Sequence, residues 1–453
     1  MKKFVLFFLL IAFVFFSGCV SCPPANWAGP RPPGCEAGDE SIFPDVPESL
    51  PSLGEIPLEQ AIPAAVAEEK FAYVLPDEFK SEFSKPEFIQ KPSLKSDFFI
   101  GHTFMDYYST NYFNSFLGST LDSMKESGNW IVYDNYFSYY SIEPPKIGEF
   151  TQRFSGFFRD ATESELKEMI LKAHEKGLKF ALMLELNYDV MRGDWQGWEY
   201  QEAFWEKSAG RLDELGRELE SNSPEINAYW DSWFKEYESF ALNHARIAEE
   251  NNAEMFIIGK QLEGALSKGN EQRWRNLIKK IKEIYKGPVS YAAWTSENFS
   301  QAEFFPYEEA DYIMIYLYNN ASGKENPSIQ ELKDSFENFN LNQFKPLSEK
   351  YGKKVIFLTP FQSRDFGAKQ EWFEPSAPSP NVKEDLLIQA KMYEAFLQSI
   401  EDEDWVQGMF TWGYWWRNDF DEMFKKGDSS FNKSSTVRNK PANEIIKKWN
   451  NSK

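Results

Sequence analysis

Short apolar runs of strand length alternate with longer segments of helical period over most of the chain. The runs typical of buried strands are 97–105, 129–137, 179–187, 254–262, 288–294, 311–318, 354–361 and 406–414. In one intervening segment Leu166, Met169, Ile170 and Ala173 recur at helical spacing, and Gly177 ends the pattern. Strands that each precede a helix pair in parallel, so these eight units predict an α/β fold of the (β/α)8 TIM-barrel type. An open doubly wound sheet is the alternative, and the absence of a GxGxxG motif after the first run argues against it.

The N-terminus has a different pattern. Two lysines precede the unbroken apolar run 4–16, and Ser17-Gly18-Cys19 follows it. This layout is typical of a secretory signal, because the run is short for a membrane span. The "SGC" ending resembles a lipobox, in which Cys19 becomes the lipidated first residue of the mature protein. An ordinary cleaved signal and an uncleaved anchor are the competing interpretations.

Proline-rich sequence without any persistent period follows the signal. It continues to about residue 95, where the alternation of strand and helix patterns begins. Such composition is typical of a semi-extended tether. We therefore expect a signal peptide over 1–18, a tether over 19–95 and the barrel over 96–453. The mature protein is expected to be secreted and anchored as a lipoprotein to the outer face of the cell membrane.

Composition and charge limit the kinds of partner that the protein can favour. The chain of 453 residues has 70 acidic and 49 basic residues and a net charge of −21, so nucleic acid is excluded as a favoured partner. Aromatic residues make up 17% of the chain, and many lie beside Asn, Asp and Gly. Such a composition suits a surface that stacks rings against a ligand, or simply a large aromatic core.

Polar and aromatic residues gather where the predicted strands end, which is where barrels of this type carry their chemistry. They are His102, Asp106, Asp134, Asn135, Glu185, Asn187, Asp189, Gln261, Glu263, Trp294, Tyr316, Tyr318, Asn319, Gln362, Arg364, Asp365, Trp412, Tyr414, Trp415 and Trp416. Carboxylates, amides and aromatic rings together are typical of sites that recognise sugars, since hydroxyls need polar partners and the C–H faces of the rings pack on Trp and Tyr.

Other chemistries are less favoured. The chain has three His, and His174 and His244 lie within predicted helices, so neither a metal centre nor a Ser-His-Asp triad is supported. The GxSxG and P-loop patterns are absent. We expect no metal and no cofactor.

The ordered motifs "ESGNWIVYDNYF", "KFALMLELN", "EMFIIGKQLEG", "GPVSYAAW", "ADYIMIYLY" and "VQGMFTWGYWW" resemble glycoside hydrolase family 113, the β-mannanase-like members of clan A. The resemblance spans residues 100–450. It implies a (β/α)8 barrel and a retaining mechanism, with a Glu after strand 4 as acid/base and a Glu at the end of strand 7 as nucleophile. This chain carries Gln261 at the first position and Thr359-Pro360 at the second.

These departures remove both standard catalytic roles, because Gln is not an acid and Pro has no nucleophilic side chain. Glu263 and Glu185 are the candidates for relocated catalytic carboxylates; Glu263 would face the same side as Gln261 if the strand stays extended. The candidate sugar-binding residues are Gln261, Asp134, Asn187, Trp294, Tyr316, Arg364, Trp412 and Trp415.

We expect a cell-surface lipoprotein whose glycoside-hydrolase-like barrel binds an oligo- or polysaccharide and lacks the standard retaining carboxylate pair. Two alternatives stay open. One is an active glycoside hydrolase or transglycosidase, β-mannanase-like, with relocated carboxylates. The other is a structural protein of the cell envelope.

Overall fold

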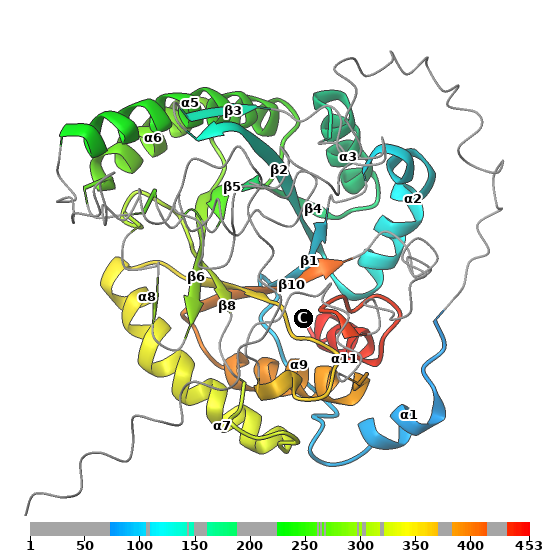
Figure 1. Cartoon of the computed structure of the whole chain (residues 1–453). Coiled ribbons are helices and arrows are strands. Elements are labelled where there is room, and N and C mark those ends of the chain that lie inside the picture. The colour runs from blue at the N-terminus through cyan, green and yellow to red at the C-terminus, as the bar shows by residue number, and fades with distance from the viewer. Residues whose placement is uncertain are drawn as a thin grey trace, which may run out of the picture. The chain divides into compact units, whose positions relative to one another are not determined.

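Parallel strands arranged around a closed sheet form the centre of the structure. The computed structural model describes residues 73–105, 109–142, 145–148, 161–187, 224–260, 262, 265–266, 269–296, 299–300, 305–317, 321–369, 383–414 and 433–453. Within these ranges eight strands are parallel neighbours in the order β1, β10, β9, β8, β6, β5, β4 and β2, and β1 also pairs with β2. This last pairing closes the sheet and confirms the predicted (β/α)8 barrel (Figure 1).

The barrel strands lie close to the predicted runs. They are β1 (Phe99–Met105), β2 (Trp130–Ile142), β4 (Lys179–Asn187), β5 (Met255–Lys260), β6 (Val289–Ser296), β8 (Ile313–Leu317), β9 (Val355–Thr359) and β10 (Val406–Tyr414). Two short strands, β3 (Pro145–Gly148) and β7 (Phe299–Ser300), pair antiparallel with β2 and β6 and have no counterpart in the sequence pattern.

Helices lie around the strands (Figure 1). They are α1 (Asp77–Phe83), α2 (Ser109–Ser127), α3 (Glu163–Glu175), α5 (Pro224–Glu250), α6 (Glu271–Ile284), α7 (Ile329–Phe339), α8 (Lys345–Tyr351), α9 (Leu386–Ile400) and α11 (Pro441–Asn450), with a π-helical turn η4 (Asn340–Phe344) and a 3₁₀ turn η5 (Gly367–Lys369). The helix α3 begins at a capping box in which Thr162 and Glu165 satisfy each other's backbone N–H groups. Its buried residues are the four apolar positions that the sequence pattern identified.

Strand side chains alternate between two apolar layers. Val132 of β2 and Met183 of β4 pack inside the barrel with the other inward residues. Their neighbours Ile131 and Leu182 point outward and pack with the helices. Since successive strand residues face opposite sides, this alternation decides which side chains reach the carboxyl ends of the strands on the inside.

The compact unit that contains the barrel begins at Tyr73, earlier than the predicted boundary at 96. Residues 73–95, called the strap below, include α1 and the buried side chains of Phe88 and Leu94. The buried apolar residues of this proline-containing segment follow neither a helix nor a strand period. The hydrophobic pattern of the sequence therefore did not identify the segment as part of the folded unit. The strap, which we expected in the tether, therefore packs on the barrel.

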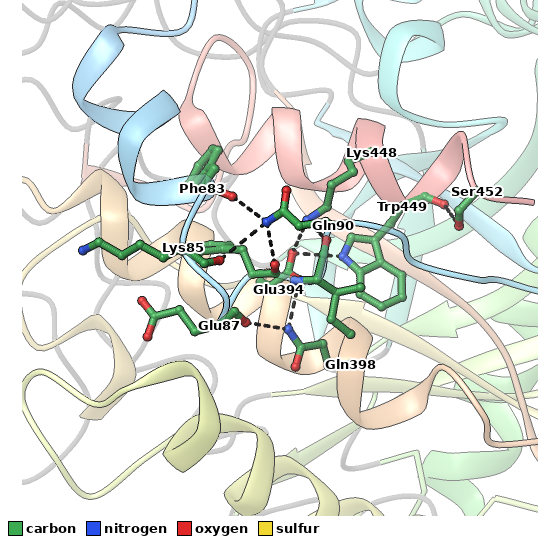
Figure 2. A network of polar contacts seen from close by, with 11 residues as sticks. Phe83, Lys85, Glu87, Gln90, Glu394, Gln398, Lys448, Trp449 and Ser452 are labelled. Carbon is green, nitrogen blue, oxygen red and sulfur yellow. Dashed lines mark hydrogen bonds and ion pairs between the residues drawn. The ribbon is translucent and has the colours of Figure 1, made fainter.

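One buried carboxylate, that of Glu394 in α9, holds the strap (Figure 2). Its Oε1 accepts hydrogen bonds from the backbone N–H of Ile89 at 2.8 Å and from Gln398 Nε2 at 2.9 Å. Its Oε2 accepts from Lys448 Nζ and Trp449 Nε1, both in α11 and both at 3.0 Å. One fully buried side chain thus links the strap, α9 and α11.

The predicted signal peptide, with Cys19, and the tether before residue 73 lie outside the described residues. Across the ranges that the structure does describe, every helix is either too short or too polar to span a membrane.

Removing the Glu394 charge should loosen the strap. We expect Glu394→Gln to lower the free energy of unfolding by about 3 kcal/mol, because the new amide NH₂ would face donors that now share a carboxylate. Urea denaturation measures this loss, and limited proteolysis should cut first within 73–95. The matched control is Glu87→Gln, whose exposed side chain lies in the same segment. Equal stability of the two variants would show that Glu394 does not hold the strap.

Candidate functional site

Inward positions at the carboxyl ends of the strands bring a charged cluster together. After the apolar pairs Val132 and Met183, the next inward residues on β2 and β4 are Asp134 and Glu185. Tyr316 of β8 and Trp412 of β10 belong to the same inner layer. These four residues were predicted for the site from the sequence.

Lys260, the last residue of β5, completes the cluster, and the sequence argument assigned it no role. Ile257 faces inward and Ile258 outward, so simple alternation places Lys260 outside. The register between β5 and β6 shifts between Ile257 and Lys260, which turns the lysine inward. Gly259 permits this irregularity, because a Cβ there would lie 2.9 Å from the ring of Tyr291. A lysine that closes a run of buried strand residues was the available signal.

The ammonium of Lys260 lies between two carboxylates. Its Nζ is 3.0 Å from Asp134 Oδ2 and also forms an ion pair with Glu185 Oε2. The Lys260 and Asp134 side chains are 1% and 0% exposed, and that of Glu185 is 15% exposed. Charged groups that are buried away from water need partners of opposite charge. Here the Lys260 ammonium is the partner of both carboxylates. Glu185 is the member of the cluster that solvent reaches.

Aromatic rings form the remaining wall around the ammonium. Lys260 Nζ lies 3.7 Å from the ring centroid of Trp412 and 5.6 Å from that of Tyr316. The two rings meet edge to face, with centroids 4.9 Å apart. A cation over the face of Trp is attracted by the ring quadrupole, so the rings hold the lysine in place.

Burial is the main influence on the pKa of Glu185. It raises the pKa of Glu185 well above its ordinary value, and the negative charge of Asp134 raises that pKa further, while Lys260 opposes both effects. Asp134 Oδ1 is buried and accepts no hydrogen bond from any residue that the structure describes. This oxygen is enclosed by the protein, so within the cluster only the Glu185 side chain, 15% exposed, is open to a ligand.

The end of β9 carries no ionisable side chain. Thr359 Oγ1 donates to the backbone carbonyl of Phe410 at 3.2 Å, and the Thr359 carbonyl accepts from Tyr393 Oη at 3.0 Å. Pro360 follows and is buried. The strand that the family resemblance expects to supply a nucleophile thus supplies only hydrogen-bonded and apolar groups.

The other predicted binding residues have different positions. Arg364 lies in the loop after β9, where its backbone bridges to Glu384, and burial lowers its pKa. Trp294 of β6 stands in register with Tyr316, and Asn187 is the last residue of β4. Gln261, Glu263 and Trp415 lie outside the described residues, as do Asp106, Asp189, Tyr318, Asn319 and Trp416.

The interpretation that Glu263 faces the same side as Gln261 depends on an extended strand, and β5 ends at Lys260. The N–H of Leu262 bonds to Tyr291 Oη at 2.8 Å, and the Leu262 carbonyl accepts from the N–H of Leu266 at 3.0 Å. Gln261 and Glu263 are outside the described residues, so the orientation of Glu263 stays a prediction.

His102 and Tyr414 were grouped with the strand-end residues, and that assignment was wrong. His102 is buried on the outer side of β1, where Ser127 Oγ lies 2.8 Å from its Nε2 and Thr411 Oγ1 lies 2.9 Å from its Nδ1. Burial lowers the His102 pKa to about 3, so its ring is neutral. Tyr414 Oη lies 2.6 Å from Ser123 Oγ of α2. Both side chains belong to the layer between barrel and helices.

No group of three or more His, Cys, Asp or Glu within the described ranges has an arrangement that could hold a metal ion.

Comparison with known proteins agrees with the barrel fold. The sequence profile of glycoside hydrolase family 113 matches residues 154–436. A solved complex of a family 113 β-1,4-mannanase superposes with a TM-score of 0.56 at 21% identity, covering 79% of this chain and 99% of that one. The family 113 β-mannanase AaManA from Alicyclobacillus acidocaldarius, in complex with ManMIm, gives 0.55 at 20% identity, covering 78% and 97%. No curated protein sequence matches the chain significantly.

Removing the ammonium should make stability depend on pH. We expect Lys260→Met to lower the free energy of unfolding by about 3–5 kcal/mol at pH 7, because two buried carboxylates lose their shared counter-charge. Their folded-state pKa values then rise above the unfolded ones. Stability is thus retained at low pH and lost as pH rises through the raised folded pKa. Urea denaturation at pH 7 and pH 5 should show the loss shrinking at pH 5.

The control is the double variant Lys260→Met with Glu185→Gln. It leaves one carboxylate instead of two and should recover part of the stability at pH 7. A loss of the same size at both pH values, unchanged in the double variant, would mean that Lys260 acts through packing alone.

Proposed function

The chain belongs to glycoside hydrolase family 113, and on that premise we propose that it binds a neutral oligosaccharide at the carboxyl ends of its barrel strands without standard retaining hydrolysis. The observation that carries this proposal is the cluster of Asp134, Glu185 and Lys260 against Trp412. Sugar recognition combines polar groups that pair with hydroxyls and aromatic rings that pack on C–H faces.

Glu185 is the group that a ligand would contact. Its side chain is 15% exposed, although its Oε2 is buried against Lys260, and Lys260 and Asp134 support it from the interior. A carboxylate accepts hydrogen bonds from sugar hydroxyls. The supporting ion pair fixes its orientation, which limits the entropy lost when a ligand binds.

The same arrangement argues against standard hydrolysis. Retention needs an ionised nucleophile and a protonated acid about 5–5.5 Å apart on either side of the glycosidic bond. Here Asp134 and Glu185 share one ammonium, and Thr359-Pro360 ends the strand from which a nucleophile is expected. An ammonium bound to a carboxylate reduces the nucleophilicity of that carboxylate. Neither Asp134 nor Glu185 is therefore ready to attack an anomeric carbon.

The names of the solved relatives suggest the first ligand to test. Both are described as β-mannanases, so β-1,4-linked mannose chains are the reference probe, with β-1,4-linked glucose chains as a comparison.

One observation favours the second candidate, an active hydrolase with relocated carboxylates. The burial that raises the pKa of Glu185 favours its protonated form, which is what a general acid needs. In that case Glu185 would protonate the leaving oxygen, and Glu263 is the candidate partner.

Calorimetric titration and product analysis separate the two candidates. We expect the full chain to bind mannohexaose or cellohexaose and to release no reducing sugar. Glu185→Gln should weaken binding about tenfold, the scale of one hydrogen bond to a charged group. The matched control Glu349→Gln changes an exposed carboxylate on α8 and should leave affinity unchanged.

Two results would contradict the proposal. Binding of neither hexasaccharide would remove these ligands and leave the structural role. Steady turnover that falls by about 10²–10⁴ in Glu185→Gln or Glu263→Gln would instead establish an acid catalyst.

We further propose that the protein is a secreted lipoprotein anchored through Cys19 to the outer face of the cell membrane. The support is the apolar run 4–16 followed by Ser17-Gly18-Cys19. A lipid on that cysteine would join the membrane to the barrel through the proline-rich tether.

Replacing the cysteine tests the anchor. Cys19→Ser should leave the protein unprocessed or release it from the membrane fraction, and the control Cys22→Ser should behave like the unmodified chain. Mass spectrometry of the mature N-terminus checks the modification. A processed N-terminus without lipid on a protein that still sediments with membranes would refute the anchor.

A further inference from the structure

Phe366 is an exposed aromatic side chain on the same side of the barrel as the Lys260 cluster. It lies in the loop that follows β9, and loops after barrel strands lie at the carboxyl ends of those strands. Three large hydrophobic side chains are exposed among the described residues, and the other two, Val74 and Leu171, are aliphatic. Phe366 is 48% exposed, so burial of its ring does not explain its presence.

The backbone of Phe366 is also unfavourable for such a residue. Its φ of 59° is in the left-handed region, where a bulky side chain is strained. The other non-glycine residues with positive φ in the described ranges are Asn252 and Asn439, and asparagine tolerates this region. Gly or Asn at 366 would satisfy the backbone better. Strain retained at an exposed position is a sign of function.

Neighbouring hydrogen bonds hold the loop in this conformation. The N–H of Asp365 donates to the Lys383 carbonyl at 2.9 Å, and Asp365 Oδ1 accepts from the N–H of Lys383 at 2.8 Å. The Ala368 carbonyl accepts from the N–H of Ser322 at 2.7 Å. Gly367 passes so close to the Gln362 carbonyl that a Cβ would lie 2.8 Å from it. The ring of Phe366 is thus presented from a fixed backbone.

Charged groups beside the ring balance each other. Lys369 Nζ lies 5.8 Å from the centroid of the Phe366 ring and 3.3 Å from Glu325 Oε1. The two charges of this pair cancel each other. The chemistry fits an uncharged polyol with an apolar face.

We propose that Phe366 is a stacking platform for one neutral pyranose unit of an oligosaccharide, at a subsite separate from the Lys260 cluster. The inference rests on the proposed carbohydrate-binding function and extends it to a chain long enough to reach both places. The C–H face of the sugar packs on the ring, and the fixed loop means that little ordering is needed on binding.

Ligands of two lengths test the subsite. The full chain is titrated by calorimetry with mannohexaose and cellohexaose, and with mannobiose and cellobiose, which supply only two rings each. Phe366→Gly should weaken hexasaccharide binding about tenfold, the scale of one aromatic stacking contact, and leave disaccharide binding unchanged. Phe366→Tyr keeps the ring and should bind as the unmodified chain does.

Two further measurements make the result decisive. Phe366→Gly should melt no lower than the unmodified protein, because glycine relieves the backbone strain, so weaker binding would not reflect unfolding. Leu171→Ala, which removes an exposed aliphatic side chain from α3, should leave all affinities unchanged.

Hexasaccharide affinity that is equal in Phe366→Gly and in the unmodified chain would overturn the inference. If Glu185→Gln at the same time weakens binding of both ligand lengths, the proposed function stands without this subsite. If the unmodified chain binds none of the four sugars, both fall.

Discussion

The contact on which the site depends is the buried ammonium of Lys260 between the carboxylates of Asp134 and Glu185. Two carboxylates in the interior of a barrel repel each other and lose hydration, so they persist there because a cation is held between them. Trp412 and Tyr316 keep that cation in position through their ring faces. The register shift in β5, made possible by Gly259, is what delivers the lysine. The position of Lys260 Nζ thus depends on the two carboxylates, on the two aromatic rings and on the irregular end of β5.

The two ends of the barrel have separate tasks. At the carboxyl ends of the strands a partly exposed carboxyl and an exposed ring face solvent, on elements held by hydrogen bonds. At the opposite ends the last residues of the strap bond to the segment just before β10, as when the N–H of Ser93 donates to Glu401 Oε1 at 2.7 Å. Glu394 fixes the rest of the strap on α9 and α11. The strap is thus held away from the site, while the loops at the carboxyl ends of the strands carry the candidate binding groups.

The barrel was predictable from the sequence because parallel strands are buried on both faces and stand out as continuous apolar runs. Asp134 and Glu185 could be assigned to the site, because each is a polar residue near the end of a continuous apolar run. Lys260 was not predicted for the site, because a local register shift reverses the alternation of side chains along β5. His102 was misassigned, because a polar residue on the outer side of a strand has the same sequence pattern as one on the inner side. The packing of the strap was not predicted, because its buried residues follow no helix or strand period. Phe366 could not be recognised, since neither its exposure nor its backbone angle is encoded in a hydrophobic pattern.

We propose that the family fold is retained and that binding at Glu185, supported by Lys260, replaces the standard retaining chemistry. A crystal structure of the protein soaked with mannohexaose tests this most directly. We expect an uncleaved oligosaccharide with a hydroxyl bonded to Glu185, while Lys260 keeps its contacts with Asp134 and Trp412. A shortened sugar, a covalent glycosyl ester on a carboxylate, or a ligand bound away from Glu185 would contradict it.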